Sequence, residues 1–186
     1  MTIGKVKIYW AQILWAIAGL LMLSAALLTA LDGHKDLAAI AIPLGLAMLL
    51  AGNINIFIFH RKHDIIHGSI LLLADGMITA FLSIFLLFNT MIESKTIPFF
   101  FGIWELVCGV LKLIESWELR SHRYYGWHRF CIVGAIEILS GVASLLKPVD
   151  DYLGMHFVVA MILFVQSLGY LFKILIYPQL ISNKTR

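Results

Sequence analysis

Six long apolar runs constrain the fold of this chain more than any other feature. They lie at about 9–31, 37–59, 68–90, 97–118, 127–146 and 154–177, and each holds 20 or more residues. An α-helix rises 1.5 Å per residue, so ~20 residues cross the ~30 Å hydrocarbon layer of a bilayer. The composition agrees, because 61% of the residues are hydrophobic and only 13% are charged. We predict an all-α membrane protein with six transmembrane helices, folded as a single integral membrane domain over residues 1–186.

The distribution of lysine and arginine between the loops predicts the topology. The N-terminal segment, the second and fourth loops and the C-terminal segment hold Lys5, Lys7, Arg61, Lys62, Arg120, Arg123, Lys184 and Arg186, whereas the other loops hold three lysines among acidic residues. Positively charged loops stay in the cytoplasm, so both termini are expected there. The first run is longer than the ~7–15 apolar residues of a signal peptide, which indicates a retained first helix. The net charge of +3 then reflects topology, and no nucleic-acid partner is predicted.

Glycines recur at a nearly fixed spacing along the chain. Gly19 and Gly52 are each followed 57 residues later by another glycine, at Gly76 and Gly109. With small length changes the pattern continues into a third unit, at Gly126, Gly134 and Gly169. This period indicates helical hairpins at about 9–59, 68–118 and 127–177, arranged as three parallel repeats about an axis along the membrane normal. Glycines are expected where helix backbones meet, and a glycine-lined substrate path is the alternative.

The motifs in these hairpins are similar to those of a known family. They are the run from Ile13 to Gly19, the run from Gly126-Trp127-His128 through Gly134-Ala135-Ile136-Glu137 to Gly141, and Lys147-Pro148 after the fifth run. Over essentially the whole chain this pattern resembles the HdeD family of bacterial acid-resistance membrane proteins, which have a short two-helix repeat. The resemblance implies a protein of the bacterial inner (cytoplasmic) membrane that serves acid or envelope stress tolerance by an unknown mechanism. It brings no catalytic residues and no cofactor.

Four ionisable residues lie inside the apolar runs: Asp75, Glu105, Lys112 and Glu137. Translocon-based scales assign an unfavourable insertion free energy of ~2.5–3.5 kcal/mol to such a residue near the centre of a membrane helix. We therefore expect each of these residues to have a role in packing or in function. All four share helix faces with glycines, at spacings that place both on one side of a helix. We therefore expect these side chains to point into the bundle and away from lipid.

Asp75 and Lys112 are predicted to form an intramembrane ion pair. Asp75 follows Gly68 by seven residues and Lys112 precedes Glu118 by six, on consecutive antiparallel helices. Both positions are ~9–10 Å from the cytoplasmic ends of their helices. Such a pair would fix the register of the two helices.

Glu105 and Glu137 form the candidate intramembrane polar site. They lie ~20 Å and ~15 Å from the cytoplasmic ends of their helices, depths at which we expect no matching cation. Two interpretations stay open for each residue. It is either a neutral acid held by hydrogen bonds between helices, or part of a proton-titrating or substrate-binding site of the kind found in transporters. The second interpretation makes a small-solute or proton-coupled transporter or channel the alternative function.

Other polar residues occupy similar positions in the runs. Gln166, Gly169 and Lys173 share one face of the sixth run. Asn53 and Asn55 lie near the end of the second run, where they either hydrogen-bond between hairpins or are solvated.

Three histidines fall close together after the second run. His60, His63 and His67 would share a face if the helix continued through them. Imidazole groups at this spacing ligate a transition metal or sense cytoplasmic pH, and ordinary interfacial histidines are the alternative. The adjacent Arg61 and Lys62 disfavour a bound metal, so no metal site is predicted.

The sequence holds no motif that indicates an enzyme. Cys108 and Cys131 lie inside apolar runs, belong to no CxxC pair and are expected to be buried thiols. The loops are five to eight residues long, too short to hold a catalytic domain. We predict a non-enzymatic protein without cofactors whose partner is the lipid bilayer, and we leave a homo-oligomer or another assembly open.

Overall fold

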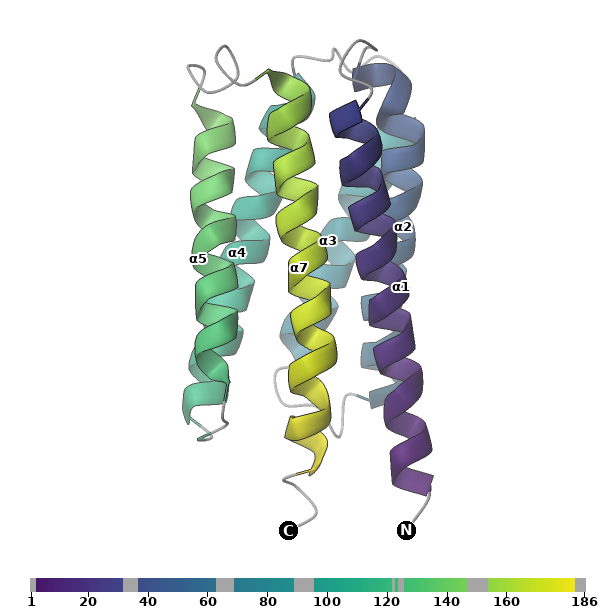
Figure 1. Cartoon of the computed structure of the whole chain (residues 1–186), viewed down its shortest axis with the longest axis vertical. Coiled ribbons are helices and arrows are strands. Elements are labelled where there is room, and N and C mark those ends of the chain that lie inside the picture. The colour runs from purple at the N-terminus through teal and green to yellow at the C-terminus, as the bar shows by residue number, and fades with distance from the viewer. Residues whose placement is uncertain are drawn as a thin grey trace.

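The computed structural model describes residues 3–31, 37–62, 69–88, 96–121, 123, 126–146 and 154–182. The helices in these ranges are α1 (Ile3–Leu31), α2 (Leu37–Lys62), α3 (Ser69–Phe88), α4 (Ile97–Ser121), α5 (Trp127–Leu145) and α7 (Met155–Ser182) (Figure 1). Each contains a segment of 19 to 25 residues that is long and apolar enough to cross a membrane. The predicted fold class, an all-α membrane protein with six membrane-spanning helices, is confirmed.

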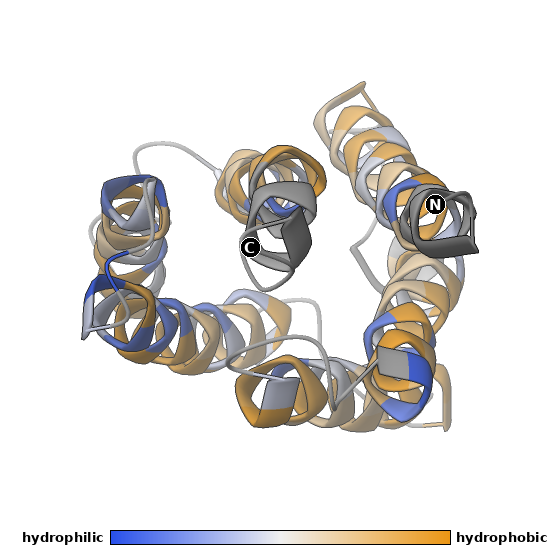
Figure 2. Ribbon diagram, turned by 90° about the horizontal axis from the view of Figure 1, so that it is seen from below, coloured by the Kyte–Doolittle hydropathy of each residue, from blue (hydrophilic) through white to orange (hydrophobic). Residues whose placement is uncertain are grey.

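The helices stand side by side along one axis, with neighbours in sequence running in opposite directions (Figure 1). α1 begins and α7 ends at the same end of the bundle, which we call the terminal end, and we call the opposite end the far end. Viewed along the axis, α7 lies between the α4–α5 pair and α1 (Figure 2). This position brings α7 into contact with α1, α4 and α5.

Large apolar side chains cover the outside of the bundle. Phe81, Leu139 and Trp10 are 75%, 69% and 66% exposed, and residues of the same kind are exposed on every one of the six helices. Figure 2 shows the prevalence of apolar residues along all of them. Water-soluble proteins rarely expose apolar surface on this scale, so these faces contact lipid.

The helices pack most extensively as three pairs, α4 with α5, α2 with α3, and α1 with α7. Each pair joins helices of different predicted hairpins, and the contacts within a predicted hairpin are less extensive. Pairs and hairpins together form a closed ring in the order α1, α2, α3, α4, α5, α7. The hairpin boundaries at 9–59, 68–118 and 127–177 stay a prediction.

Glycines lie where the paired helices approach most closely. A Cβ added to Gly109 of α4 would lie 2.8 Å from the carbonyl oxygen of Gly134 of α5. A Cβ added to Gly52 of α2 would lie 2.8 Å from the carbonyl oxygen of Gly76 of α3. The α1–α7 pair is looser, because a Cβ on Gly19 would find its nearest neighbour at 3.4 Å. Glycine therefore acts in packing at these contacts, as expected from the sequence.

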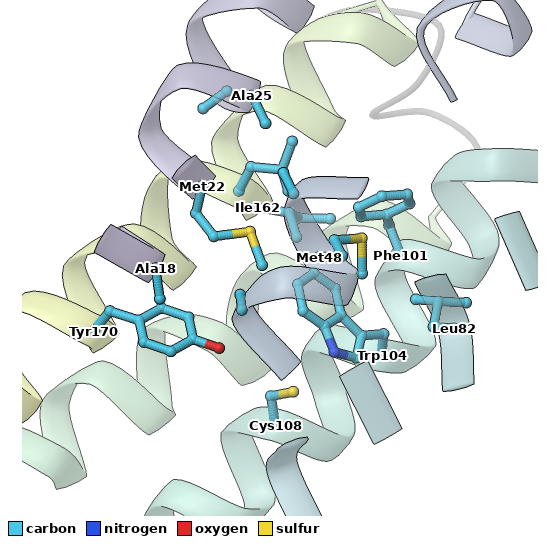
Figure 3. Packing of buried hydrophobic residues seen from close by; sticks show 14 of the residues in the cluster. Ala18, Met22, Ala25, Met48, Leu82, Phe101, Trp104, Cys108, Ile162 and Tyr170 are labelled. Carbon is cyan, nitrogen blue, oxygen red and sulfur yellow. The ribbon is translucent and has the colours of Figure 1, made fainter. Parts of the chain in front are cut away.

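The interior is apolar toward the far end and again close to the terminal end. Figure 3 shows Met22 of α1, Met48 of α2, Phe101 of α4 and Ile162 of α7 packed together, and each is at most 1% exposed. Within about a turn of the terminal end, a second group is at most 2% exposed and consists of Ile58, Leu72, Leu119 and Phe130. Most buried polar side chains of the bundle lie between these two apolar layers.

The α4–α5 contact predicts that Gly109→Ala destabilises the protein. Alanine favours a helix over glycine by ~1 kcal/mol, but its methyl group would meet the Gly134 carbonyl oxygen and Ile138 at 2.8 Å. Overpacking of this kind costs ~1–3 kcal/mol, so we expect a lower melting temperature in detergent. Gly19→Ala is the matched control, and we expect it to keep or raise the melting temperature. Equal stability of the two variants would contradict the role assigned to Gly109.

Candidate functional site

The four ionisable residues predicted inside the membrane are all buried. Asp75 is 7% exposed, Lys112 is 4% exposed, and Glu105 and Glu137 are completely buried. Lys173, which is 3% exposed, joins them from α7. These side chains point into the bundle, as expected, and they form two separate clusters there.

The first cluster is centred on Asp75 of α3, and we call it the Asp75 cluster. Its members are Trp15, Asn55, Asp75, Cys108, Tyr170 and Lys173. The ammonium group of Lys173 lies 2.8 Å from Oδ2 of Asp75. Asn55 donates to the same oxygen at 2.9 Å, and the thiol of Cys108 donates to Oδ1 at 3.4 Å. One carboxylate therefore receives donors from α2, α4 and α7.

The Asp75 cluster also orders the side chain of Asn55. The indole N–H of Trp15 on α1 donates to Oδ1 of Asn55 at 3.1 Å, while Nδ2 of Asn55 contacts the hydroxyl of Tyr170 at 3.3 Å. Asn55 bonds between helices, whereas Asn53 is exposed and donates to the Leu49 carbonyl of its own helix.

The second cluster lies between α4, α5 and α7, and we call it the Lys112 cluster. Its members are Glu105, Lys112, Glu137, Ser140 and Gln166. The ammonium group of Lys112 lies 2.5 Å from Oε1 of Glu137 and donates to Oε1 of Gln166 at 3.3 Å. Gln166 in turn donates through Nε2 to Oε2 of Glu105 at 2.8 Å. Ser140 lies 3.2 Å from the other carboxyl oxygen of Glu105.

The structure gives Asp75 and Lys112 different partners from the predicted ones. Asp75 pairs with Lys173 and Lys112 pairs with Glu137, so the expected Asp75–Lys112 ion pair is corrected. The cause is the packing of α4, which contacts α5 far more extensively than α3. A Cβ added to Gly134 of α5 would lie 3.2 Å from Cβ of Lys112, so the lysine side chain starts beside α5 and reaches Glu137.

Glu105 and Glu137, the candidate polar site, do lie in one cluster. They are linked through Lys112 and Gln166, which our depth estimates did not assign to them. Within the described residues Oε2 of Glu137 has no hydrogen-bond partner, whereas Oε1 contacts the ammonium group of Lys112. A functional role for the two acids stays a prediction.

Gly169 makes room for the Lys112–Glu137 pair. It lies on α7 between Gln166 and Lys173, on the face that the sequence indicated. A Cβ at this position would lie 3.1 Å from Cε of Lys112 and 3.4 Å from Oε1 of Glu137. The α7 face thus supplies a partner to each cluster, and its glycine leaves room for the ion pair of the Lys112 cluster.

The remaining predicted residues lie apart from the two clusters or outside the described ranges. His60 is exposed near the end of α2, while His63 and His67 lie outside the described residues. In the part of the chain that the structure describes, no three His, Cys, Asp or Glu side chains are placed to hold a metal ion. Cys108 is buried and belongs to the Asp75 cluster, whereas Cys131 is half-buried.

Fold and interior together define a multi-pass α-helical membrane protein with buried ionic clusters. Residues 74–146 match a family model described as a short repeat of unknown function (DUF308). The matched segment covers most of α3, all of α4 and α5, and every member of the Lys112 cluster except Gln166. Searches of curated proteins and of solved structures each return no match. The matched repeat extends over less than half of this chain.

The Asp75–Lys173 contact predicts compensation between two substitutions. Asp75→Asn or Lys173→Met alone leaves a buried unpaired charge, which costs ~3–5 kcal/mol. The double variant Asp75→Asn/Lys173→Met removes both charges and should recover much of the lost melting temperature. As the matched control, Asp75→Asn combined with Lys112→Met should show additive losses. If the melting temperature recovered in the control variant instead, Lys112 would be the partner of Asp75, as the sequence suggested.

The space at Gly169 predicts a strong dependence on side-chain size. Gly169→Ala should be tolerated, because the nearest atom belongs to the flexible end of Lys112 and needs to move by only a few tenths of an ångström. Gly169→Leu should separate Lys112 from Glu137 and lower the melting temperature far more. The melting temperatures of the two variants are compared by thermal unfolding in detergent. Equal melting temperatures would show that the Lys112–Glu137 pair does not need the space left by Gly169.

Proposed function

We propose that this chain is a non-enzymatic, multi-pass protein of the bacterial inner membrane, of the HdeD type, that contributes to tolerance of acid or envelope stress. Two observations support the family assignment. Residues 74–146 match the short-repeat family to which HdeD-like proteins belong, and the glycine motifs extend the resemblance over the rest of the chain.

The observation that supports a structural role is the closed interior. Asp75 and Glu137 each contact a lysine, and buried apolar side chains lie toward both ends of the bundle from the clusters. Breaking such a pair by protonating the carboxylate would leave a buried lysine without its partner, which is strongly unfavourable. A bundle held in this way keeps its packing when the pH outside falls. Persistence in acid is the property expected of a protein that supports the membrane under this stress.

Side chains at the terminal end support a cytoplasmic location for that end. The guanidinium of Arg120 lies 5.0 Å from the ring centroid of Trp127 and 5.9 Å from that of Trp117. Arg61 lies 5.5 Å from the ring centroid of Phe57. Tryptophan is enriched at membrane interfaces and arginine in cytoplasmic loops, so we propose that the terminal end faces the cytoplasm. The lipid bilayer is the proposed partner, with further copies of the chain as an open alternative.

The second candidate function is a small-solute or proton-coupled transporter or channel. The observation that favours it is Oε2 of Glu137, a buried carboxylate oxygen without a hydrogen-bond partner in the described residues. Buried oxygens of this kind normally have a donor, and a solute carrying an N–H or O–H group would supply one. Glu105, in the same cluster, would then complete a binding site near the middle of the bundle.

Two measurements separate the candidates. Cells that lack the chain should survive a shift to acid less well, and both the wild type and the neutral pair Asp75→Asn/Lys173→Met should restore survival. The purified protein in liposomes containing a pH-sensitive dye should show no proton flux above that of protein-free liposomes. A flux that falls on Glu137→Gln would instead establish a transporter, and unchanged acid survival would reject the proposed stress function.

A further inference from the structure

The charges of the Lys112 cluster do not balance. The Asp75 cluster holds one carboxylate and one ammonium group, whereas the Lys112 cluster holds the two carboxyl groups of Glu105 and Glu137 beside a single lysine. Both carboxyl groups are completely buried, and Lys112 is 4% exposed. An uncompensated charge in such a place is strongly unfavourable, and buried ionisable groups avoid it by taking up or releasing a proton. One additional proton would make the Lys112 cluster neutral.

The contacts identify the carboxyl group that holds this proton. Glu137 contacts the ammonium group of Lys112, and an ionised carboxylate is the form that such a contact favours. The polar contacts of Glu105 are with neutral groups, the amide of Gln166 and the hydroxyl of Ser140. Among the described residues no ion pair involves Glu105. Glu105 is therefore the carboxyl group that the cluster leaves without a cation.

The hydroxyl of Ser140 lies where it can accept such a proton. Its Oγ is 3.0 Å from the backbone carbonyl oxygen of Glu137 and 3.2 Å from Oε1 of Glu105. A hydroxyl has one hydrogen to donate and two lone pairs to accept, and a carbonyl oxygen can only accept. If Ser140 donates to the nearer oxygen, the carbonyl of Glu137, then its own oxygen is an acceptor directed at Oε1 of Glu105. A proton on Oε1 completes this arrangement.

We infer that Glu105 is a proton-binding site, with the proton on Oε1 donated to Oγ of Ser140. The hydrogen bonds then run in one direction, from Lys112 to Gln166, from Gln166 to Oε2 of Glu105, from Oε1 to Ser140, and from Ser140 to the Glu137 carbonyl oxygen. Gln166, Glu105 and Ser140 then each accept one hydrogen bond and donate one. This inference goes beyond the proposed function and holds for either candidate.

Release of the proton has a defined structural consequence. The O–H bond of Glu105 breaks, the proton passes to water, and Ser140 turns to donate to the new carboxylate. The Glu137 carbonyl then loses the hydroxyl donor, and the cluster gains a net negative charge. The charged groups around Glu105 are Lys112 of the same helix and Glu137 of α5, and the Asp75–Lys173 pair lies in the other cluster. Since the nearest cation already pairs with Glu137, loss of the proton weakens the packing of α4, α5 and α7.

Infrared spectroscopy tests the proton directly, because a protonated carboxyl group has a C=O stretching band that a carboxylate lacks. The measurement uses the full chain at neutral pH in a detergent without carbonyl groups, where exposed carboxyl groups are ionised. We expect the band in the wild type, its loss in Glu105→Gln, and its retention in the matched control Asp75→Asn/Lys173→Met. In Ser140→Ala the band should persist at a shifted frequency, because the acceptor of the proton is gone.

Two results would overturn the inference: no such band in the wild type, or an undiminished band in Glu105→Gln. If Glu105→Gln does not fold, Ser140→Ala decides, since an unshifted band would place the proton elsewhere. Stability provides a second readout. The native state would bind one more proton than the unfolded state at every pH above ~4.3, where a glutamate of the unfolded chain ionises, so this site should lower wild-type stability progressively from that pH upward until Glu105 ionises in the native state. Glu105→Gln places an uncharged mimic of the protonated acid at this position, so its stability should lack this pH-dependent decrease. An equal decrease in the wild type and in Glu105→Gln would contradict a proton-binding site at Glu105.

Discussion

Charge without water is the physical problem around which this bundle is organised. A lysine or carboxylate inside the membrane cannot be solvated, so every such group needs a partner supplied by another helix. α7 supplies partners to both clusters, because Lys173 neutralises Asp75 of α3 and Gln166 links Lys112 to Glu105 of α4. The position of α7 between the α4–α5 pair and α1 follows from this double role (Figure 2).

Close backbone packing makes the charged interior feasible. Glycine at the α4–α5 and α2–α3 contacts brings these helices together, so the side chains beside the contacts reach across short distances. Gly109 lies three residues before Lys112 and Gly134 three residues before Glu137, so in these antiparallel helices the two charged residues flank the glycine contact, about one turn away on either side. Packing and electrostatics are therefore coupled at this site. A change that pushes α4 away from α5 also separates the charges.

The architecture follows from sequence patterns, whereas the charge partners do not. Run length and apolar content predict the six helices closely, and the glycine spacing predicts which helix faces are in contact. Partner choice depends on which helices pack most closely, and depth along a helix does not reveal this. Lys112 and Lys173 both lie nine residues from the terminal ends of their helices, yet Lys112 pairs with Glu137 of α5 and Lys173 with Asp75 of α3.

The repeat itself contains too little information to predict the polar network. Thr79 precedes Glu137 by 58 residues, the spacing that relates Gly76 to Gly134, so equivalent positions hold a hydroxyl in one unit and an acid in the next. Thr79 accepts a hydrogen bond from Trp104, whereas Glu137 contacts Lys112. Ser140 had no distinguishing pattern in the sequence, because a single serine inside an apolar helix is common. Its importance follows from its two neighbours in space.

The pairing of α1 with α7 has a consequence for biosynthesis. Domains and their elements emerge from the ribosome in order, at ~5–20 residues per second, so α1 enters the bilayer well before its most extensive neighbour exists. During that interval Asp75 of α3 also lacks its partner Lys173, so the interior contains a carboxylate without a neutralising cation. The arrival of α7 closes the ring and neutralises the interior in one event. Partly made chains are thus chemically distinct from finished ones, a difference by which a cell's membrane proteases could sort them.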